Sequence, residues 1–160
     1  MAMGQKLAAK GPSPPDLYSV QLRLLVPPLG ETPPTGVNFG DMKQDVILSS
    51  GKPFQKGDRV NATFWSANPR YDLLTEGTFA VVERLEAGKW IPSYDDDDFC
   101  LYFKYAADIS GYNGSAIIEW ELPEDVTPGI YRLRHFGSSK KTTDSPTQYF
   151  TGASSAFEVS

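Results

Sequence analysis

A period-two alternation of apolar and polar residues runs from Asp45 to the end of the chain, and it constrains the fold more than any other feature. Successive side chains of a strand point to opposite faces of a sheet, so this period is typical of half-buried β-strands. Turn residues such as "QKGDR" and "EAGK" separate the alternating segments, and no long amphipathic helix pattern interrupts them. The pattern therefore predicts an all-β fold, an antiparallel β-sandwich with eight or nine short strands. The predicted strands cover residues 45–48, 60–66, 78–85, 90–94, 99–105, 115–122, 130–136, 148–151 and 156–159.

One local motif narrows the class of sandwich. In "LPEDVTPGIYRLRHF" a proline-flanked acidic turn leads into a strand that opens with Gly129, Ile130 and Tyr131. A tyrosine near the start of a late strand, with its hydroxyl bonded back across the corner, is the tyrosine corner of immunoglobulin-like sandwiches. We expect Tyr131 to take this place, and the alternative is an ordinary half-buried tyrosine. The predicted fold is thus immunoglobulin-like.

Size and charge exclude several functional classes. The 160 residues suit one domain, and 40% of them are hydrophobic, which is enough for a substantial core. The formal net charge is −5 and there is no basic stripe, so nucleic-acid binding is not expected. No apolar run approaches the roughly 20 residues of a membrane-spanning helix. The first residues also lack the apolar middle region of a signal peptide.

The sequence is poor in catalytic side chains. It contains a single histidine, His135, and a single cysteine, Cys100. Zinc catalysis usually requires two or three histidine ligands, which one histidine cannot supply. A serine nucleophile served by His135 is formally possible, but no GxSxG motif is present. Structural roles are therefore favoured for His135 and for Cys100, which lies between the core-facing Phe99 and Leu101 of a predicted strand.

The four consecutive aspartates at 95–98 are the one group of side chains in the sequence that points to a specific chemistry. One interpretation is a solvated acidic turn between two strands. The other is part of a calcium or magnesium site, because these ions prefer oxygen ligands. If the segment is extended, Asp96 and Asp98 point to the same side. Two carboxylates are half of a calcium site, so further oxygens would have to come from backbone, water or another domain.

The segment before about residue 37 is different in character. It combines a possible short helix over 1–10, an apolar stretch at 17–26 and the proline- and glycine-rich "PPLGETPPTG". We therefore expect residues 1–36 to be the tail of another domain plus a linker. Residues 37–160 are expected to form the sandwich domain.

Read in order, four segments carry a family resemblance: "FWSANPRYDLLTEGTFAVVERLE", "YDDDDFCLYFKY", "AIIEWELPEDVTPGIYRLRHFG" and "FTGASSAFEVS". Together they resemble the C-terminal part of neutral ceramidases. The upstream "KGPSPPDL" and "TPPTGVNFGDMKQDV" are similar to the segment that joins the catalytic and C-terminal domains in that family. The resemblance covers nearly the whole chain.

The resemblance implies a non-catalytic role within a larger enzyme. Neutral ceramidases hydrolyse the amide of ceramide to sphingosine and a fatty acid, with a zinc-activated water held by two histidines, a glutamate and a tyrosine. Those ligands belong to a catalytic domain that this chain lacks, so the chain alone is predicted to be inactive. The implied partner is that catalytic domain, and contact with ceramide or membrane would come only through the parent enzyme.

The family also has a structural divalent ion between its two domains. The matching acidic stretch falls on Asp96 and Asp98, and a further family ligand, a threonine, falls on Leu101. Leucine offers only a backbone carbonyl, so Leu101 departs from the pattern. The resemblance implies Ca²⁺ or Mg²⁺ at this position, with Zn²⁺ confined to the absent catalytic domain.

Two further expectations concern surfaces. The loop "ANPRYDLLTEGTF" is interpreted either as docking surface for the catalytic domain or as an ordinary irregular loop. The alternative function is a free-standing module that binds a lipid surface or carbohydrate through Trp65, Tyr71 and Tyr112. The sequons at Asn61 and Asn113 give weak support to a secretory location of the parent protein, and Asn113 is the better expected acceptor because it lies in a turn-like segment.

Overall fold

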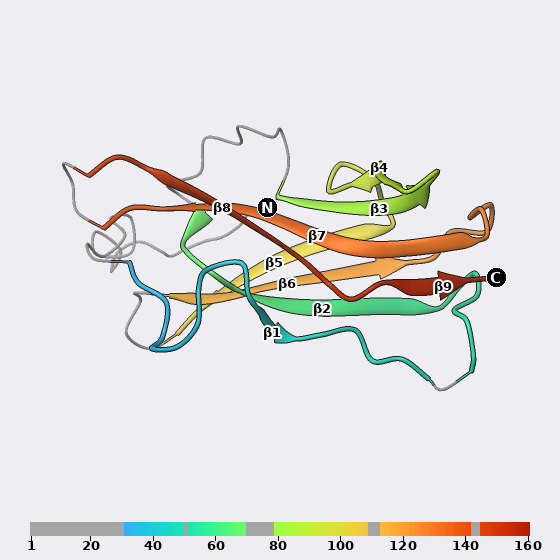
Figure 1. Ribbon diagram of the computed structural model, residues 1–160, viewed down its shortest axis with the longest axis horizontal. Coiled ribbons are helices and arrows are strands. Elements are labelled where there is room, and N and C mark those ends of the chain that lie inside the picture. The colour runs from blue at the N-terminus through green and yellow to red at the C-terminus, as the bar shows by residue number, and fades with distance from the viewer. Residues whose placement is uncertain (1–30, 50, 70–78, 109–112, 142–144) are drawn as a thin grey trace.

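The computed structural model describes residues 31–49, 51–69, 79–108, 113–141 and 145–160. These residues form nine β-strands (Figure 1), and none of them lies in a helix that is long and apolar enough to cross a membrane. The expected helix over 1–10 and the apolar stretch over 17–26 lie outside the described residues. The strands are β1 (Met42–Gln44), β2 (Arg59–Ser66), β3 (Ala80–Glu86), β4 (Lys89–Asp95), β5 (Leu101–Ala107), β6 (Gly114–Glu121), β7 (Gly129–Ser139), β8 (Gln148–Ala153) and β9 (Phe157–Val159).

The strands form two antiparallel sheets, as the alternation predicts. One sheet has the order β1-β2-β6-β5. The other has the order β4-β3-β7-β8, with β9 also pairing with β7. Strands distant in sequence are neighbours in both sheets, which is typical of immunoglobulin-like sandwiches rather than of simple meanders. The predicted all-β, immunoglobulin-like class is confirmed.

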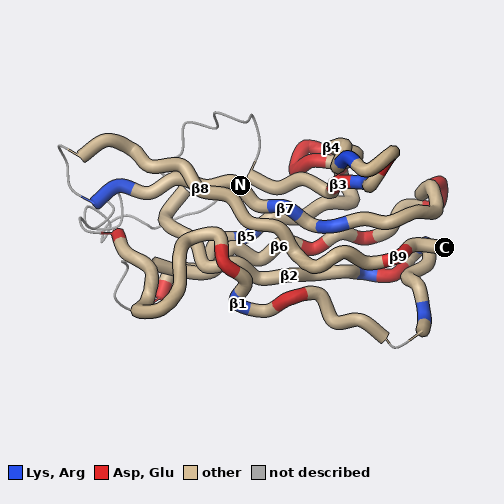
Figure 2. The backbone as a smooth tube through the Cα atoms, in the orientation of Figure 1, with Lys and Arg blue, Asp and Glu red and all other residues tan. Residues whose placement is uncertain are grey.

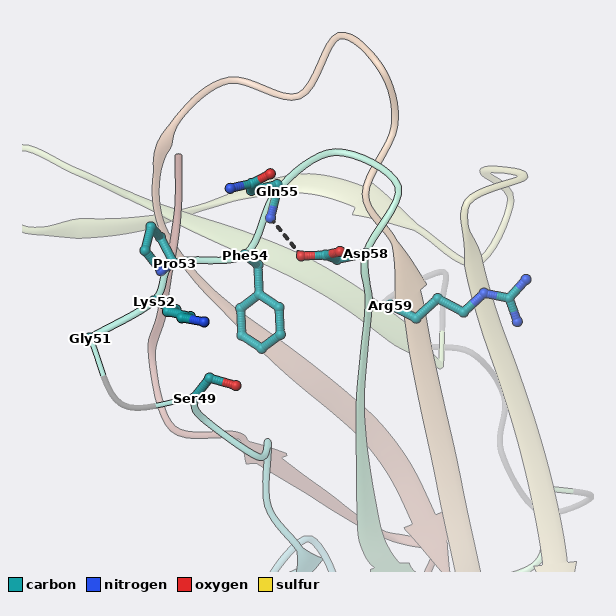
Figure 3. Close-up of a pocket in the computed structure, with 8 residues that line it drawn as sticks. All are labelled: Ser49, Gly51, Lys52, Pro53, Phe54, Gln55, Asp58 and Arg59. Atoms are coloured by element: carbon teal, nitrogen blue, oxygen red, sulfur yellow. Dashed lines mark hydrogen bonds between the residues drawn. The ribbon is translucent and has the colours of Figure 1, made fainter.

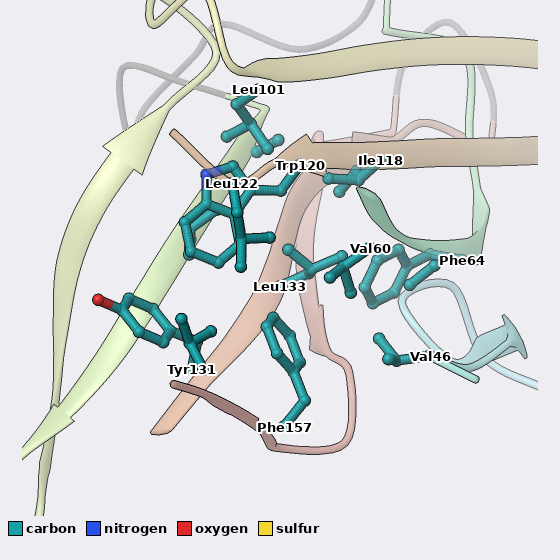
Figure 4. Packing of buried hydrophobic residues seen from close by; sticks show 14 of the residues in the cluster. Val46, Val60, Phe64, Leu101, Ile118, Trp120, Leu122, Tyr131, Leu133 and Phe157 are labelled. Atoms are coloured by element: carbon teal, nitrogen blue, oxygen red, sulfur yellow. The ribbon is translucent and has the colours of Figure 1, made fainter. Parts of the chain in front are cut away.

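The core lies between the two sheets and is built from the inward positions of the alternating segments (Figure 4). Phe64, Ile118, Trp120 and Leu133 are all completely buried. Trp120 packs against Tyr131 with ring centroids 5.0 Å apart, so side chains of β6 and β7 join the sheets directly. Each large apolar side chain that is fully buried stabilises the fold by about 1.5–3 kcal/mol.

Tyr131 forms the predicted tyrosine corner. Its side chain is 1% exposed, and its hydroxyl donates to the carbonyl oxygen of Thr127 at 2.5 Å. The bond ties the start of β7 to the turn that precedes it. The hairpin turn between β3 and β4 also forms as predicted, with Ala87 and Gly88 at φ values of 50° and 78°. Positive φ at both central residues is what a tight two-residue hairpin requires.

Two expectations about strands are wrong. Residues 45–48 are not a strand, and β1 ends at Gln44 instead. The side chain of Asp45 explains why no strand forms here. Its carboxylate accepts hydrogen bonds from the backbone N–H groups of Val46 and Ser155, so bonds to a side chain replace the backbone hydrogen bonds of a β-sheet. The strand expected from residue 99 begins only at Leu101, and Phe99 is 98% exposed rather than directed into the core.

Hydrogen bonds to Glu31 connect the first described residues to the sandwich. Its side chain is 1% exposed and accepts bonds from the backbone N–H groups of Asn68 at 2.8 Å and Lys140 at 3.2 Å. The neighbouring Thr32 carbonyl accepts from Nδ2 of Asn113 at 3.1 Å. Three loops at one end of the sandwich thus hold residues 31 and 32. The division into 1–36 and 37–160 stays a prediction.

Candidate functional site

The four aspartates form a hydrogen-bonded turn that leads out of β4. The Asp95 N–H donates to Oδ2 of Asp98 at 2.9 Å, and the Asp97 N–H donates to Oδ1 of Asp95 at 2.9 Å. The Asp98 N–H closes the turn on the Asp95 carbonyl at 2.9 Å. Figure 2 shows acidic residues gathered beside β4. Carboxylates are tolerated here in part because they accept bonds from backbone donors that the turn would otherwise leave unpaired.

Asp96 connects this turn to the start of the neighbouring strand β3. Its Oδ2 accepts the N–H of Phe79 at 2.9 Å. The segment is therefore a turn and not the extended run from which a shared direction of Asp96 and Asp98 was expected. The segment bends because the side chains of Asp95, Asp96 and Asp98 accept hydrogen bonds from backbone N–H groups rather than projecting from a regular pleat.

Leu101 lies where the turn meets β5. Its N–H donates to the Asp98 carbonyl at 3.2 Å, and its side chain is 3% exposed within the core. The side chain is thus committed to packing. Only the backbone carbonyl of Leu101 has the chemistry of a metal ligand.

The chemistry of the turn suits a hard divalent ion, but its ligand set is incomplete. Asp96 and Asp98 each use one carboxylate oxygen for a backbone bond, and an oxygen with two lone pairs retains the capacity to coordinate a cation. Within the described ranges, no three His, Cys, Asp or Glu side chains converge as a metal site would require. Further ligands of an ion at this turn would have to be backbone oxygens, water or groups outside the described residues.

His135 occupies a structural place in the core, as predicted. It is 1% exposed and stacks near Phe64 and Phe103, with ring centroids 5.6 Å away in both cases. Nδ1 lies 2.9 Å from the carbonyl oxygen of Phe79, and Nε2 lies 2.9 Å from Oγ of Ser66. Because a carbonyl can only accept, we assign the proton to Nδ1, which makes Nε2 the acceptor of the Ser66 hydroxyl proton.

This serine–histidine pair is buried away from solvent. Ser66 is 2% exposed, and burial lowers the pKa of His135 to about 4, so the imidazole is neutral near pH 7. Sequence reasoning missed Ser66 as the partner because the two residues are 69 positions apart and nothing local marks the pair. The pair links β2 to β7 across the core instead of forming a nucleophile. Burial likewise raises the pKa of the Cys100 thiol, which disfavours the reactive thiolate.

A surface hollow of about 560 Å³ lies in the loop before β2 (Figure 3). Its charged residues are largely engaged with neighbours. Asp58 accepts the Gln55 N–H at 2.9 Å, and Arg59 forms ion pairs with Glu119 and Glu121 at 3.3 and 3.6 Å. Its lining residues contain no histidine, cysteine or pair of carboxylates.

The remaining expected surface residues fall in different places. Trp65 is half-buried, and the ammonium of Lys43 lies 4.6 Å from its ring centroid, so part of its face is already covered. Tyr71, Tyr112 and most of the loop "ANPRYDLLTEGTF" lie outside the described residues. Asn113 is buried and bonded to Thr32, whereas Asn61 is exposed on β2, which contradicts the preference for Asn113 as a glycan acceptor.

Comparison with known proteins identifies the family. The family model described as "Neutral/alkaline non-lysosomal ceramidase, C-terminal" matches residues 1–159. The chain belongs to this family. Neutral ceramidase 2 of Arabidopsis thaliana is 52% identical over 153 residues, which cover 94% of this chain and 20% of that protein. Neutral ceramidase 1 of the same organism is 47% identical over 152 residues, covering 93% of this chain and 19% of that protein.

Solved structures agree with the ceramidase assignment. The crystal structure of neutral ceramidase from Pseudomonas aeruginosa is similar with a TM-score of 0.71 and 28% identity, covering 81% of this chain and 20% of that chain. A ceramidase complexed with C2 is similar with a TM-score of 0.74, covering 91% of this chain and 22% of that chain. The chain thus corresponds to a ceramidase C-terminal domain and spans about a fifth of the length of its relatives.

Proposed function

We propose that this chain is the non-catalytic C-terminal domain of a neutral ceramidase, and that it stabilises the domain that hydrolyses ceramide to sphingosine and fatty acid. The observation that carries the proposal is the family match over residues 1–159. The chain's own chemistry agrees with it, because the single histidine is buried and neutral. A zinc-activated water would supply the nucleophile in the parent enzyme, and this chain has no second histidine to hold such an ion.

A direct assay tests the non-catalytic role. Purified chain is incubated with a fluorescent ceramide in detergent, with and without added zinc, beside a full-length neutral ceramidase as positive control. We expect no release of fatty acid above the buffer blank. Release that is abolished by a zinc chelator and persists through further purification would contradict the proposal.

The second part of the proposal concerns the aspartate turn. Asp96 and Asp98 contribute carboxylate ligands to a Ca²⁺ or Mg²⁺ ion shared with the catalytic domain, and Leu101 contributes at most its carbonyl. Support comes from the residues of the turn, because Asp96 and Asp98 place carboxylate oxygens, the ligands that hard divalent ions prefer, within one short segment. A bound cation would also offset the repulsion among four adjacent carboxylates.

Calorimetric titration separates the shared site from a simple acidic turn. The chain alone is titrated with calcium and with magnesium, and so is a full-length protein in which this chain replaces the matching C-terminal stretch of Neutral ceramidase 2. We expect tight binding only in the full-length protein, and its loss in the Asp96→Ala variant. Asp97→Ala is the matched control, because Asp97 lies in the same turn but is not assigned as a ligand. Equal effects of the two substitutions would exclude the assigned site.

A further inference from the structure

Asn61 lies on the solvent-facing side of β2. It alternates with Val60 and Ala62, which are buried in the core, so its own side chain points outward. Asn61 is exposed, and its side-chain amide forms no hydrogen bond to another described residue. The charged neighbours on this face bond to each other instead, since Nη1 of Arg59 donates to Oε2 of Glu119 at 3.3 Å. The amide nitrogen of Asn61 is therefore open to solvent.

Thr63 completes the sequon Asn-Ala-Thr two positions further along the same face of β2. The neighbouring strand β1 ends beside it, because Gln44 pairs with Thr63 and Met42 pairs with Phe64. Among the described residues, no strand pairs with the preceding part of β2 on that side. Asn61 thus lies next to an open sheet edge. Natural proteins usually cover or blunt such edges, because unpaired backbone groups promote association with other chains.

The fold closes the second sequon, which begins at Asn113. Asn113 is 9% exposed, and its Nδ2 donates to the Thr32 carbonyl at 3.1 Å. Ser115 supplies the hydroxyl of this sequon and is 8% exposed, and its Oγ accepts a hydrogen bond from Nζ of Lys43 at 2.9 Å. A sugar attached to Asn113 would have to displace these contacts.

We propose that Asn61 carries an N-linked glycan in the folded protein and that Asn113 does not. A three-residue sequon often arises by chance, so the motif alone does not carry the assignment. The carrying observation is that the structure leaves the amide of one sequon free in solvent and engages the amide of the other in a bond within the fold. A glycan is bulky and hydrated, and at Asn61 it would also shield the open edge of β2 from other chains.

The modification is a group transfer from a polyisoprenyl diphosphate oligosaccharide. Nδ2 of Asn61 attacks the anomeric carbon of the first sugar, so an N–C bond forms while the C–O bond to the diphosphate breaks. The polyisoprenyl diphosphate leaves with the bonding electrons, the amide nitrogen loses one proton, and nothing is oxidised or reduced. The proposal therefore requires a secretory route for the parent protein. It is independent of the roles proposed above for the domain and for the aspartate turn.

Glycosylation-site mapping tests the assignment. A full-length protein in which this chain replaces the matching stretch of Neutral ceramidase 2, to which it is 52% identical, is expressed in Arabidopsis thaliana cells. A peptide N-glycosidase that accepts plant glycans is applied in water enriched in a heavy oxygen isotope. It converts each glycosylated asparagine to a labelled aspartate, which mass spectrometry locates. We expect label at Asn61 and none at Asn113. Absence of label at Asn61, or label at Asn113, would overturn the inference.

Variants of both sequons provide the controls. Thr63→Ala removes the hydroxyl that the sequon requires and should abolish the label at Asn61, whereas Thr63→Ser keeps a hydroxyl and should retain it. Ser115→Ala removes the sequon at Asn113 and should leave the label at Asn61 unchanged. Label that persists at Asn61 in the Thr63→Ala variant would contradict modification through this sequon.

Thermal unfolding tests whether the folded sheet accommodates the glycan. Asn61→Gln removes the acceptor, and because Asn61 bonds to no described residue the unglycosylated variant should melt no higher than the glycosylated protein. A variant that melts higher would show that the sugar strains the sheet, and this would count against the inference. Failure at Asn61 leaves the proposed domain role intact, because that role rests on the family match over residues 1–159.

Discussion

The burial of His135 predicts a specific loss of stability in mild acid. The imidazole is 1% exposed, and its pKa is lowered to about 4 because burial disfavours the charged form. An unfolded histidine titrates near pH 6.5, so between these values the unfolded chain binds more protons than the folded one. Stability from this residue is therefore fully present above about pH 6.5 and is lost as the pH falls toward about 4.

The magnitude follows from the difference between the two pKa values. A lowering of about 2.5 pH units corresponds to about 3 kcal/mol at full titration, and about 2 kcal/mol of this is lost between about pH 7 and about pH 5. Glu31 acts in the opposite direction, because burial raises its pKa and the folded state then binds the extra proton. Protonation of Glu31 therefore increases stability as the pH falls through its raised pKa, and this offsets part of the stability lost through His135.

Urea unfolding followed by tryptophan fluorescence measures the effect at a series of pH values. Trp120 is completely buried and reports on the core. His135→Gln is the matched variant, since an amide can bond to Ser66 and to the Phe79 carbonyl but does not titrate in this range. We expect the variant to be less stable at neutral pH and to lose the histidine-dependent slope. Parallel pH profiles for the wild-type chain and the variant would refute the reasoning.

Three further predictions use the same unfolding assay at neutral pH. Tyr131→Phe removes the hydrogen bond to the Thr127 carbonyl and should lower the free energy of unfolding by about 1 kcal/mol. An unchanged urea midpoint would show that this bond does not stabilise the fold. Glu31→Ala leaves two backbone N–H groups without their acceptor and should cost about 2 kcal/mol or more, while Thr32→Ala, which keeps the carbonyl, should cost little. Gly152→Ala places a methyl group against the Gly40 carbonyl and should cost about 1–3 kcal/mol, whereas Gly36→Ala meets no neighbouring atom and serves to measure backbone strain alone.

Local patterns carried most of the information about the fold. The alternation located β2 and β6 to within one residue at each end, because one buried face imposes period two on any strand. The motif before Tyr131 located the corner, since the bond joins residues only four positions apart. Where the alternation was interrupted by side-chain bonds, as at Asp45 and after Asp95, the prediction of a strand was wrong. The alternation of apolar and polar residues does not show whether a backbone N–H group will bond to a side chain or to a neighbouring strand.

The sequence by itself determined the strand content, the tyrosine corner, the lack of a second histidine and the family. Each of these depends on residues near one another in the chain or on composition. Tertiary structure alone decided the order of strands in the two sheets, the burial of Glu31, the pairing of Ser66 with His135 and the exposure of Phe99. These depend on which distant segments meet, and contact across tens of residues is selected by the packing of the whole core rather than by any local signal.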